Sequence, residues 1–199
     1  MARHHGPVLV DTNVILESHR IGSWRALAGG YRVETAGDCF AETQAGKQRR
    51  RPEQRMDANA LRTSMAAVHR VRDRERAELA VRVPDVALDR GEASLWAHAV
   101  HREDSWLLCG PDTASLRFGL RLGFRDRLVS LERLLDNVGQ HPIPLLRPSY
   151  TRLSMIGASQ DQREALGPLH RADGVAIQQS EQPLYVPQHD QTDRLHCAD

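Results

Sequence analysis

The chain is organised around Pro7-Val8-Leu9-Val10-Asp11-Thr12-Asn13-Val14-Ile15-Leu16. A short, unbroken apolar run of this kind is typical of a strand that is buried on both faces in a parallel sheet. The chain turns polar at Asp11 and apolar again at Val14, which predicts a strand followed directly by a helix. Because ligands bind at the carboxyl ends of parallel strands, Asp11 lies where such a sheet carries its chemistry. A structural role as the N-cap of the next helix explains Asp11 equally well.

Length and composition predict one globular domain of ordinary size with an appendage. The chain has 199 residues, of which 40% are hydrophobic and 27% are charged. No apolar run approaches the roughly 20 residues that span a bilayer, and the N-terminal residues lack the apolar centre of a signal peptide. We therefore expect a cytoplasmic protein that has no membrane partner. The three cysteines are far apart and indicate neither a disulfide framework nor a zinc site.

Strand-like and helix-like segments alternate from residue 7 to residue 138. The expected strands are 7–11, 31–35, 81–88, 105–110 and 127–131. The expected helices are 12–29, 39–44 with Asp38 as its N-cap, 89–100, 113–122 and 132–138. This alternation predicts an α/β fold with a central parallel sheet.

The segment 47–82 is rich in arginine and permissive for helix. It contains 11 basic and five acidic residues, and apolar residues spaced by three, four and eight predict one inward-facing side. Either these arginines contact the phosphates of a nucleic acid, or they form a solvated helical surface. The candidate nucleic-acid contacts are Arg49, Arg50, Arg51 and Arg55.

The character of the chain changes after Gly139. Pro142, Pro144 and Pro148 mark a linker, and residues 150–199 contain seven glutamines and little clustering of apolar residues. We therefore predict a domain over 1–140 and a Pro/Gln-rich extension over 141–199 that is loosely ordered or binds a partner.

Four carboxylates occupy comparable places in the predicted fold. Asp11 and Asp112 follow strand ends, and Glu42 and Glu92 lie early in helices that follow strand-like segments. In a parallel sheet all four converge on one edge, where their mutual repulsion requires a cation. Oxygen ligands of this kind suit Mg²⁺, which activates water for phosphodiester hydrolysis. For Glu92 the structural alternative is a capping box with Asp89.

Residues 8–138 resemble a PIN domain, the nuclease fold that includes toxins of bacterial toxin–antitoxin pairs. The resemblance rests on four stretches, which are Val8–Asn13, Phe40-Ala41-Glu42, Leu88–Ala93 and Leu107–Asp112. It implies a three-layer α/β/α sandwich and an acidic quartet of Asp11, Glu42, Glu92 and Asp112 that holds Mg²⁺ or Mn²⁺. It further implies that Thr12 and Asn13 support Asp11 and that Asp89 caps its helix.

The expected function is a metal-dependent endoribonuclease, with RNA as the substrate rather than DNA. The resemblance also implies a homodimer and, for a toxin, an antitoxin partner. The long arginine-rich segment and the tail after about 140 depart from a compact toxin.

Other functions remain open at this stage. A second Mg²⁺-dependent phosphoryl-transfer fold also places an aspartate after its first strand, but it requires an acid where Asn13 stands. A catalytically silent module that binds RNA or a partner protein would keep the basic segment without cleavage.

The remaining candidates have ordinary structural roles. His98 and His101 lie three residues apart on a predicted helix, where histidines at the surface or with a satisfied hydrogen bond are commoner than metal ligands. The three tryptophans, Trp24, Trp96 and Trp106, are expected in the core.

Overall fold

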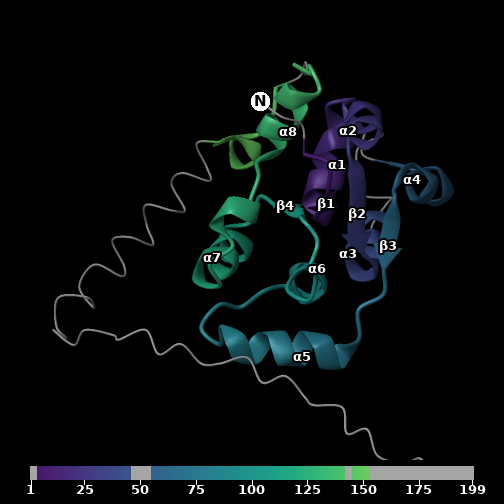
Figure 1. Ribbon diagram of the computed structural model, residues 1–199. Helices are drawn as coiled ribbons and strands as arrows, with labels where there is room; N and C mark the ends of the chain where they lie inside the picture. Colours follow the sequence, from purple (N-terminus) through teal and green to yellow (C-terminus); the bar gives the residue numbers. More distant parts are fainter. Residues whose placement is uncertain (1–3, 46–54, 142–144, 153–199) are drawn as a thin grey trace, which may run out of the picture.

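A sheet of parallel strands forms the centre of the structure, a computed structural model that describes residues 4–45, 55–141 and 145–152. The strands are β1 (Pro7–Val10), β2 (Arg32–Ala36), β3 (Ala67–His69) and β4 (Leu107–Cys109). Within the described residues they form one four-stranded sheet in the order β3-β2-β1-β4, and every neighbouring pair is parallel (Figure 1). The predicted α/β fold with a central parallel sheet is confirmed.

Helices follow the strands in alternation. They are α1 (Thr12–Arg20), α2 (Trp24–Gly30), α3 (Gly37–Gln44), α4 (Ala58–Ser64), α5 (Asp73–Arg82), α6 (Arg90–Ala99), α7 (Thr113–Arg121) and α8 (Leu131–Asn137). Two short 3₁₀ turns, η3 (Arg125–Arg127) and η4 (Pro148–Tyr150), complete the described elements. Side chains that accept hydrogen bonds from backbone N–H groups of the first turn fix several helix starts. These caps are Asp11, Asp57, Asp89, Asp112 and Ser130.

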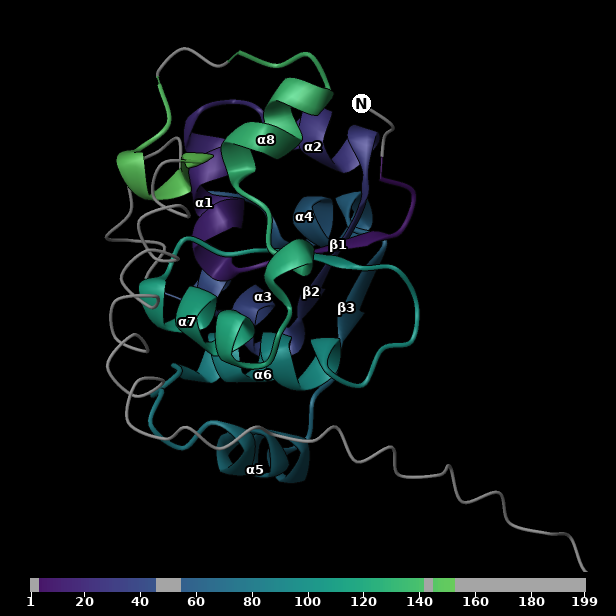
Figure 2. The same ribbon diagram turned by 60° about the vertical axis from the view of Figure 1, so that its left-hand side comes forward.

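Two hydrophobic clusters cover the two faces of the sheet, because successive strand residues point to opposite sides. On one face, Val8, Val10 and Val33 pack with residues of α1, α2, α4 and α8. On the other face, Leu9 and Ala36 pack with residues of α5, α6 and α7. The sheet therefore lies between helices on both sides (Figure 2). The tryptophans are buried as predicted, and they are Trp24, Trp96 and Trp106.

The prediction of one helix over 12–29 is wrong. Gly22 has a φ of +68°, a left-handed conformation that ends α1 and lets the chain turn into α2. The prediction that Asp38 caps the next helix is also wrong, because Ala36 is the N-cap and α3 begins at Gly37. Asp38 instead accepts hydrogen bonds from the side chain of Ser94 and from arginines of α5 and α6.

The arginine-rich region is not one helical arm. It contains α4, β3 and α5 in succession, and the strand β3 was not predicted. Three half-buried residues give little local signal, so pairing with β2 decides their conformation. The predicted strand over 81–88 is wrong, because α5 continues to Arg82 and the residues between α5 and α6 form turns and bends without a strand.

The predicted last strand over 127–131 is also wrong. Leu128 makes a single isolated parallel bridge to Leu108, and the preceding residues form the turn η3. The N–H of Val129 donates to the carbonyl oxygen of Leu108 at 3.0 Å. Because α8 begins at Leu131, the segment has no room to lengthen into a strand. The predicted helices 113–122 and 132–138 are confirmed within one residue as α7 and α8.

Residues 145–152 pack against the domain. Tyr150 is buried, and its hydroxyl donates to the carbonyl oxygen of Asn13 at 3.2 Å. The backbone N–H of Arg147 donates to the carboxylate of Glu17 at 3.0 Å. The predicted boundary at about residue 140 stays a prediction, and residues 153–199 of the predicted extension lie outside the described residues. Every helix in the described part of the chain is too short or too polar to cross a membrane.

Packing between α6 and α7 gives a stability prediction. A Cβ at Gly119 would lie 2.5 Å from Cη2 of the buried Trp96. We expect Gly119→Ala to lower the free energy of unfolding by about 1–3 kcal/mol, because a filled core cannot accept the methyl group without strain.

Urea-induced unfolding measures this change, and Gly29→Ala is the matched control. The Cβ added at Gly29 meets no heavy atom within 4 Å, so this variant should gain up to about 1 kcal/mol. Equal stability of the two variants would contradict the packing described for α7.

Candidate functional site

Asp11 lies directly after β1, at the carboxyl edge of the sheet. Its backbone N–H donates to the carbonyl oxygen of Cys109 at 3.1 Å, which ties the end of β1 to the end of β4. Its side chain caps α1 by accepting from the N–H of Asn13 at 3.1 Å. The carboxylate is only 5% exposed, and burial raises the pKa of Asp11 to about 6. Asp11 therefore caps α1, and burial destabilises its charged form.

Glu42 reaches the same edge from α3, which follows β2. The hydroxyl of Thr12 donates to Oε2 of Glu42 at 2.6 Å, and Thr12 is buried. A Cβ at Gly91 would lie 2.9 Å from both carboxylate oxygens of Glu42, so this carboxylate rests against the first turn of α6. The hydroxyl of Thr12 contacts Glu42, while backbone hydrogen bonds of Asn13 and Thr12 support the carboxylate of Asp11.

Glu92 and Asp89 form the capping box that their spacing predicts. The N–H of Glu92 donates to Oδ1 of Asp89 at 2.8 Å, and the N–H of Asp89 donates to Oε2 of Glu92 at 3.1 Å. Glu92 is 5% exposed. Its burial, followed by the negative charges of Asp112, Asp89 and Asp11, raises the pKa of Glu92 to about 8. The cap thus holds a carboxyl group that prefers to stay protonated at neutral pH.

Asp112 follows β4 and caps α7. Its Oδ1 accepts from the N–H of Ala114 at 2.7 Å. The side chain is exposed, in contrast to Asp11 and Glu92, and its charge contributes to the raised pKa of Glu92.

The structure brings the predicted acids to one edge of the sheet. Electrostatic effects link Asp11 to Glu42 and Asp89, and link Glu92 to Asp11, Asp89 and Asp112. In the described part of the chain, three or more potential ligand atoms come within 4.8 Å of one another at Glu34, His69 and His98, and not among these acids. No three of the acids therefore bring their oxygens within 4.8 Å of one another. Mg²⁺ keeps several of its waters, so it does not need direct contact with every acid.

A cavity of about 530 Å³ beside this edge is lined by five arginines together with Asp38 and Asp73. The start of α3 and the start of α6 line it, and both helices carry acids of the edge. Asp38 in this cavity accepts from Arg76 at 2.9 Å and from Arg90 at 2.7 Å. The arginines that line the cavity are Arg62, Arg70, Arg72, Arg76 and Arg90.

Of the four arginines predicted to contact nucleic acid, the structure describes only Arg55. Arg49, Arg50 and Arg51 lie outside the described residues. Arg55 is exposed and lines a different cavity, together with Trp24 and Arg25. Four of the cavity arginines lie in the arginine-rich segment 47–82 that the sequence singled out, although not among the four specific candidates, and Arg90 of α6 joins them only in the fold.

Sequence reasoning missed that Glu34, His69 and His98 form a polar cluster on the face of the sheet that α6 covers. Glu34 is 2% exposed, and its Oε2 lies 2.8 Å from Nε2 of His69. The ring of His98 stacks on that of His69 with 3.8 Å between their centroids. Burial, together with the charges of His69 and Arg102, lowers the pKa of His98 to about 4. The sequence signal that could have revealed this cluster is Glu34, an acidic residue at a buried position of β2.

A comparison of the chain with known proteins finds no matching family model, no similar curated sequence and no similar solved structure.

The raised pKa of Glu92 predicts how stability depends on pH. Glu92 protonates near pH 4.5 in the unfolded chain and near pH 8 in the folded chain, so unfolding releases a proton between these values. The free energy of unfolding should therefore fall as pH rises through this window. It should fall by about 1.4 kcal/mol per pH unit relative to Glu92→Gln, which keeps the cap without the charge.

Urea unfolding of both proteins from pH 5 to pH 8 tests this dependence. Glu103→Gln, at an exposed position, controls for loss of one carboxylate. Saturating Mg²⁺ should reduce the difference between wild type and Glu92→Gln. A difference that stays constant with pH would contradict the buried environment of Glu92.

Proposed function

We propose that the chain is a metal-dependent endoribonuclease whose domain is a PIN-like α/β/α sandwich. The quartet of Asp11, Glu42, Glu92 and Asp112 would hold Mg²⁺ or Mn²⁺. The observation that carries the proposal is the shared edge, where buried carboxyl groups with raised pKa values adjoin other acids. Such an arrangement is costly unless a cation binds there.

The donor set of the edge fits a hard divalent ion, because all four side chains offer carboxylate oxygens. All four side chains are held by defined contacts. The hydroxyl of Thr12 orients Glu42, and one oxygen of Asp11, Glu92 and Asp112 accepts from a backbone N–H group. The second oxygen of Asp11 has only the weak thiol donor of Cys39, at 3.8 Å. Since a carboxylate has two oxygens, a cap that uses one is compatible with a metal ion on the other. A bound ion supplies the positive charge that activates water and stabilises the leaving oxygen of a phosphodiester.

The arginine-lined cavity is the proposed path of the RNA backbone. Guanidinium groups suit bidentate contacts to phosphates. Arg90 follows Asp89 of the capping box directly in the chain, and it lines the cavity. The capping box and the cavity therefore adjoin each other at the start of α6. A phosphate held there lies next to the acids, as cleavage requires.

The alternative is a catalytically silent module that binds RNA or a partner protein. The observation that favours it is the capping role of Asp11, Asp89 and Asp112, which explains these residues without chemistry. The narrower hypotheses of a toxin, an antitoxin partner, a homodimer and a cytoplasmic location rest on the sequence alone. Loss of metal-dependent cleavage in a cap-preserving variant separates the enzyme from the silent module.

Asp11→Asn is that variant, because the amide oxygen still accepts from the N–H of Asn13. We expect it to reduce RNA cleavage in Mn²⁺ or Mg²⁺ by at least about 100-fold, with the fold intact. Cleavage of total RNA and of single-stranded DNA, with either metal or with chelator, measures the loss and the preferred nucleic acid.

Asp57→Asn is the matched control, since Asp57 caps α4 in the same manner. It should cleave like wild type. Normal cleavage by Asp11→Asn would overturn the proposed mechanism. RNA binding that survives chelation, without cleavage by any protein, would favour the silent module.

The cavity predicts a separate effect on RNA affinity. Arg70→Gln/Arg72→Gln should weaken binding and reduce the slope of log affinity against log salt by about 1.4, since single-stranded contacts contribute about 0.7 each. Fluorescence anisotropy of a labelled RNA over a salt series measures both quantities.

Arg74→Gln/Arg82→Gln removes the same charge from exposed positions of α5 that do not line the cavity. This control should leave the salt slope near the wild-type value. An equal loss in both double variants would show that the cavity has no special role.

A further inference from the structure

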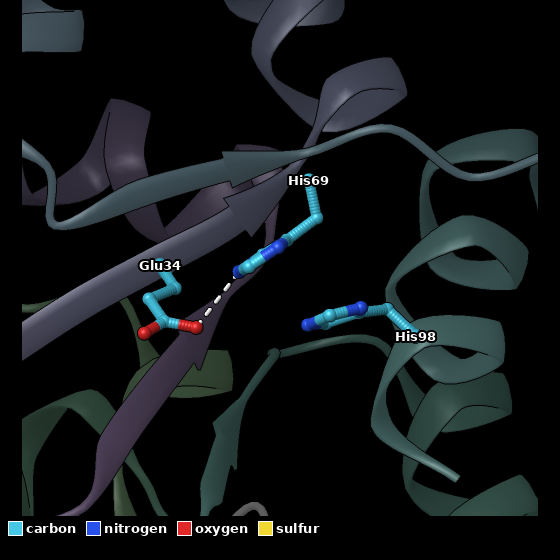
Figure 3. A group of neighbouring side chains, drawn as sticks. All are labelled: Glu34, His69 and His98. Atoms are coloured by element: carbon cyan, nitrogen blue, oxygen red, sulfur yellow. Dashed lines mark hydrogen bonds and ion pairs between the residues drawn. The ribbon is translucent and has the colours of Figure 1, made fainter. Parts of the chain in front are cut away.

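A second group of potential metal ligands lies on the sheet face that α6 covers. Glu34 comes from β2, His69 ends β3 and His98 lies in the last turn of α6. Glu34 is the register partner of Ala67, so Glu34 and His69, two residues further along, point to the same side. Figure 3 shows the two imidazole rings one over the other, with Glu34 at their edge. One ligand atom from each side chain lies within 4.8 Å of the other two.

We propose that Glu34, His69 and His98 bind a divalent transition metal ion, for which Zn²⁺ is the best match. Two imidazole nitrogens and one carboxylate oxygen are a common zinc ligand set that leaves a fourth position open. Zn²⁺ holds such ligands at about 2.0–2.2 Å, so ligand atoms around one ion lie roughly 3.3 Å apart. Oε2 of Glu34 and Nε2 of His69 are already 2.8 Å apart. Because a metal ion lies in the plane of each imidazole that binds it, the two stacked rings must turn relative to one another when the ion binds.

The cationic side chain of Arg102 already contacts this cluster. Its Nη1 donates to Oε2 of Glu34 at 2.8 Å and lies 2.8 Å from Nε2 of His98. A positively charged donor thus already contacts two of the three side chains. The rest of the guanidinium pairs with Asp104, through Nε at 2.8 Å and Nη2 at 2.6 Å. Because the guanidinium is rigid, Nη1 leaves the cluster only if the whole group moves, so Arg102 competes with a metal ion for this place.

The far oxygen of Glu34 has a partner of its own. Nη2 of Arg32 donates to Oε1 of Glu34 at 3.0 Å. This contact fixes the carboxylate so that Oε2 faces the two histidines. A carboxylate oriented by an outer partner is a recurrent feature of metal sites, and it favours a single ligand geometry.

This site differs from the acidic edge in its ligand chemistry and does not share a residue with the proposed quartet, although His69 also lines the arginine-rich cavity. His98 follows Glu92 by six residues on α6, which places it roughly 9 Å further along the helix. The acidic edge offers oxygen ligands only, whereas this cluster offers two nitrogens and therefore selects transition metals. A metal here would link β2, β3 and α6. The proposal does not depend on nuclease activity.

Calorimetric titration of the full chain with Zn²⁺, supported by the visible absorption of Co²⁺, tests the site. Wild type should bind Zn²⁺ at this site, and His98→Gln should weaken that binding by at least about tenfold. Arg102→Gln should bind at least about tenfold tighter than wild type, because it removes a positive charge that touches the site. The double variant Arg102→Gln/His98→Gln should lose this gain.

His101→Gln is the matched control, since this histidine lies on the exposed side of the same helix end. It should titrate like wild type and so account for ions held by other histidines. Circular dichroism confirms that each variant folds. Superimposable titrations of wild type and His98→Gln, or an unchanged affinity in Arg102→Gln, would overturn the proposal and leave Glu34, His69 and His98 as a hydrogen-bonded network only.

Discussion

Parallel pairing of β1 with β2 and β4 is the constraint on which the rest of the structure depends. The register places Val10 opposite Cys109 and Leu9 opposite Glu34, so the three strands reach the same edge together. Asp11 follows β1 directly and Asp112 follows β4 within one short turn, whereas Glu42 comes from α3 after β2 and Glu92 comes from α6. A slip of two residues in either pairing would move one strand end by about 6.6 Å and disperse them. The acidic edge is therefore a consequence of register.

Two buried carboxylates, Glu34 of β2 and Glu92 of α6, show how the surroundings of an acid decide its charge. Glu34 is buried, yet the hydrogen bond from His69 and the charge of Arg102 lower its pKa. Glu92 is also buried, and other acids surround it, so its pKa rises to about 8. The first carboxylate already has cationic partners within the fold. A cation bound at the edge would stabilise the charged form of the second, which is the physical basis of the proposed metal site.

Local patterns in the sequence predicted the features that depend on local chemistry. The apolar run before Asp11 predicted β1, and the spacing of Asp89 and Glu92 predicted their capping box. The break at Gly22 and the strand ending at His69 were missed, because a left-handed turn and an edge pairing leave weak local signals. Sequence order predicted that the acids share an edge. It could not show which arginines form the cavity or that His98 faces Glu34, because both depend on how separate elements pack.

The central claim is that the acidic edge binds a divalent metal ion. The most direct test follows the backbone amide signals of the folded protein by NMR as substoichiometric Mn²⁺ is added. The amides of Asn13, Glu92 and Ala114 donate to the side chains of Asp11, Asp89 and Asp112, so a paramagnetic ion at the edge lies close to all three. We predict that these signals broaden first and together. Broadening that begins elsewhere and spares all three amides would contradict a metal site at this edge.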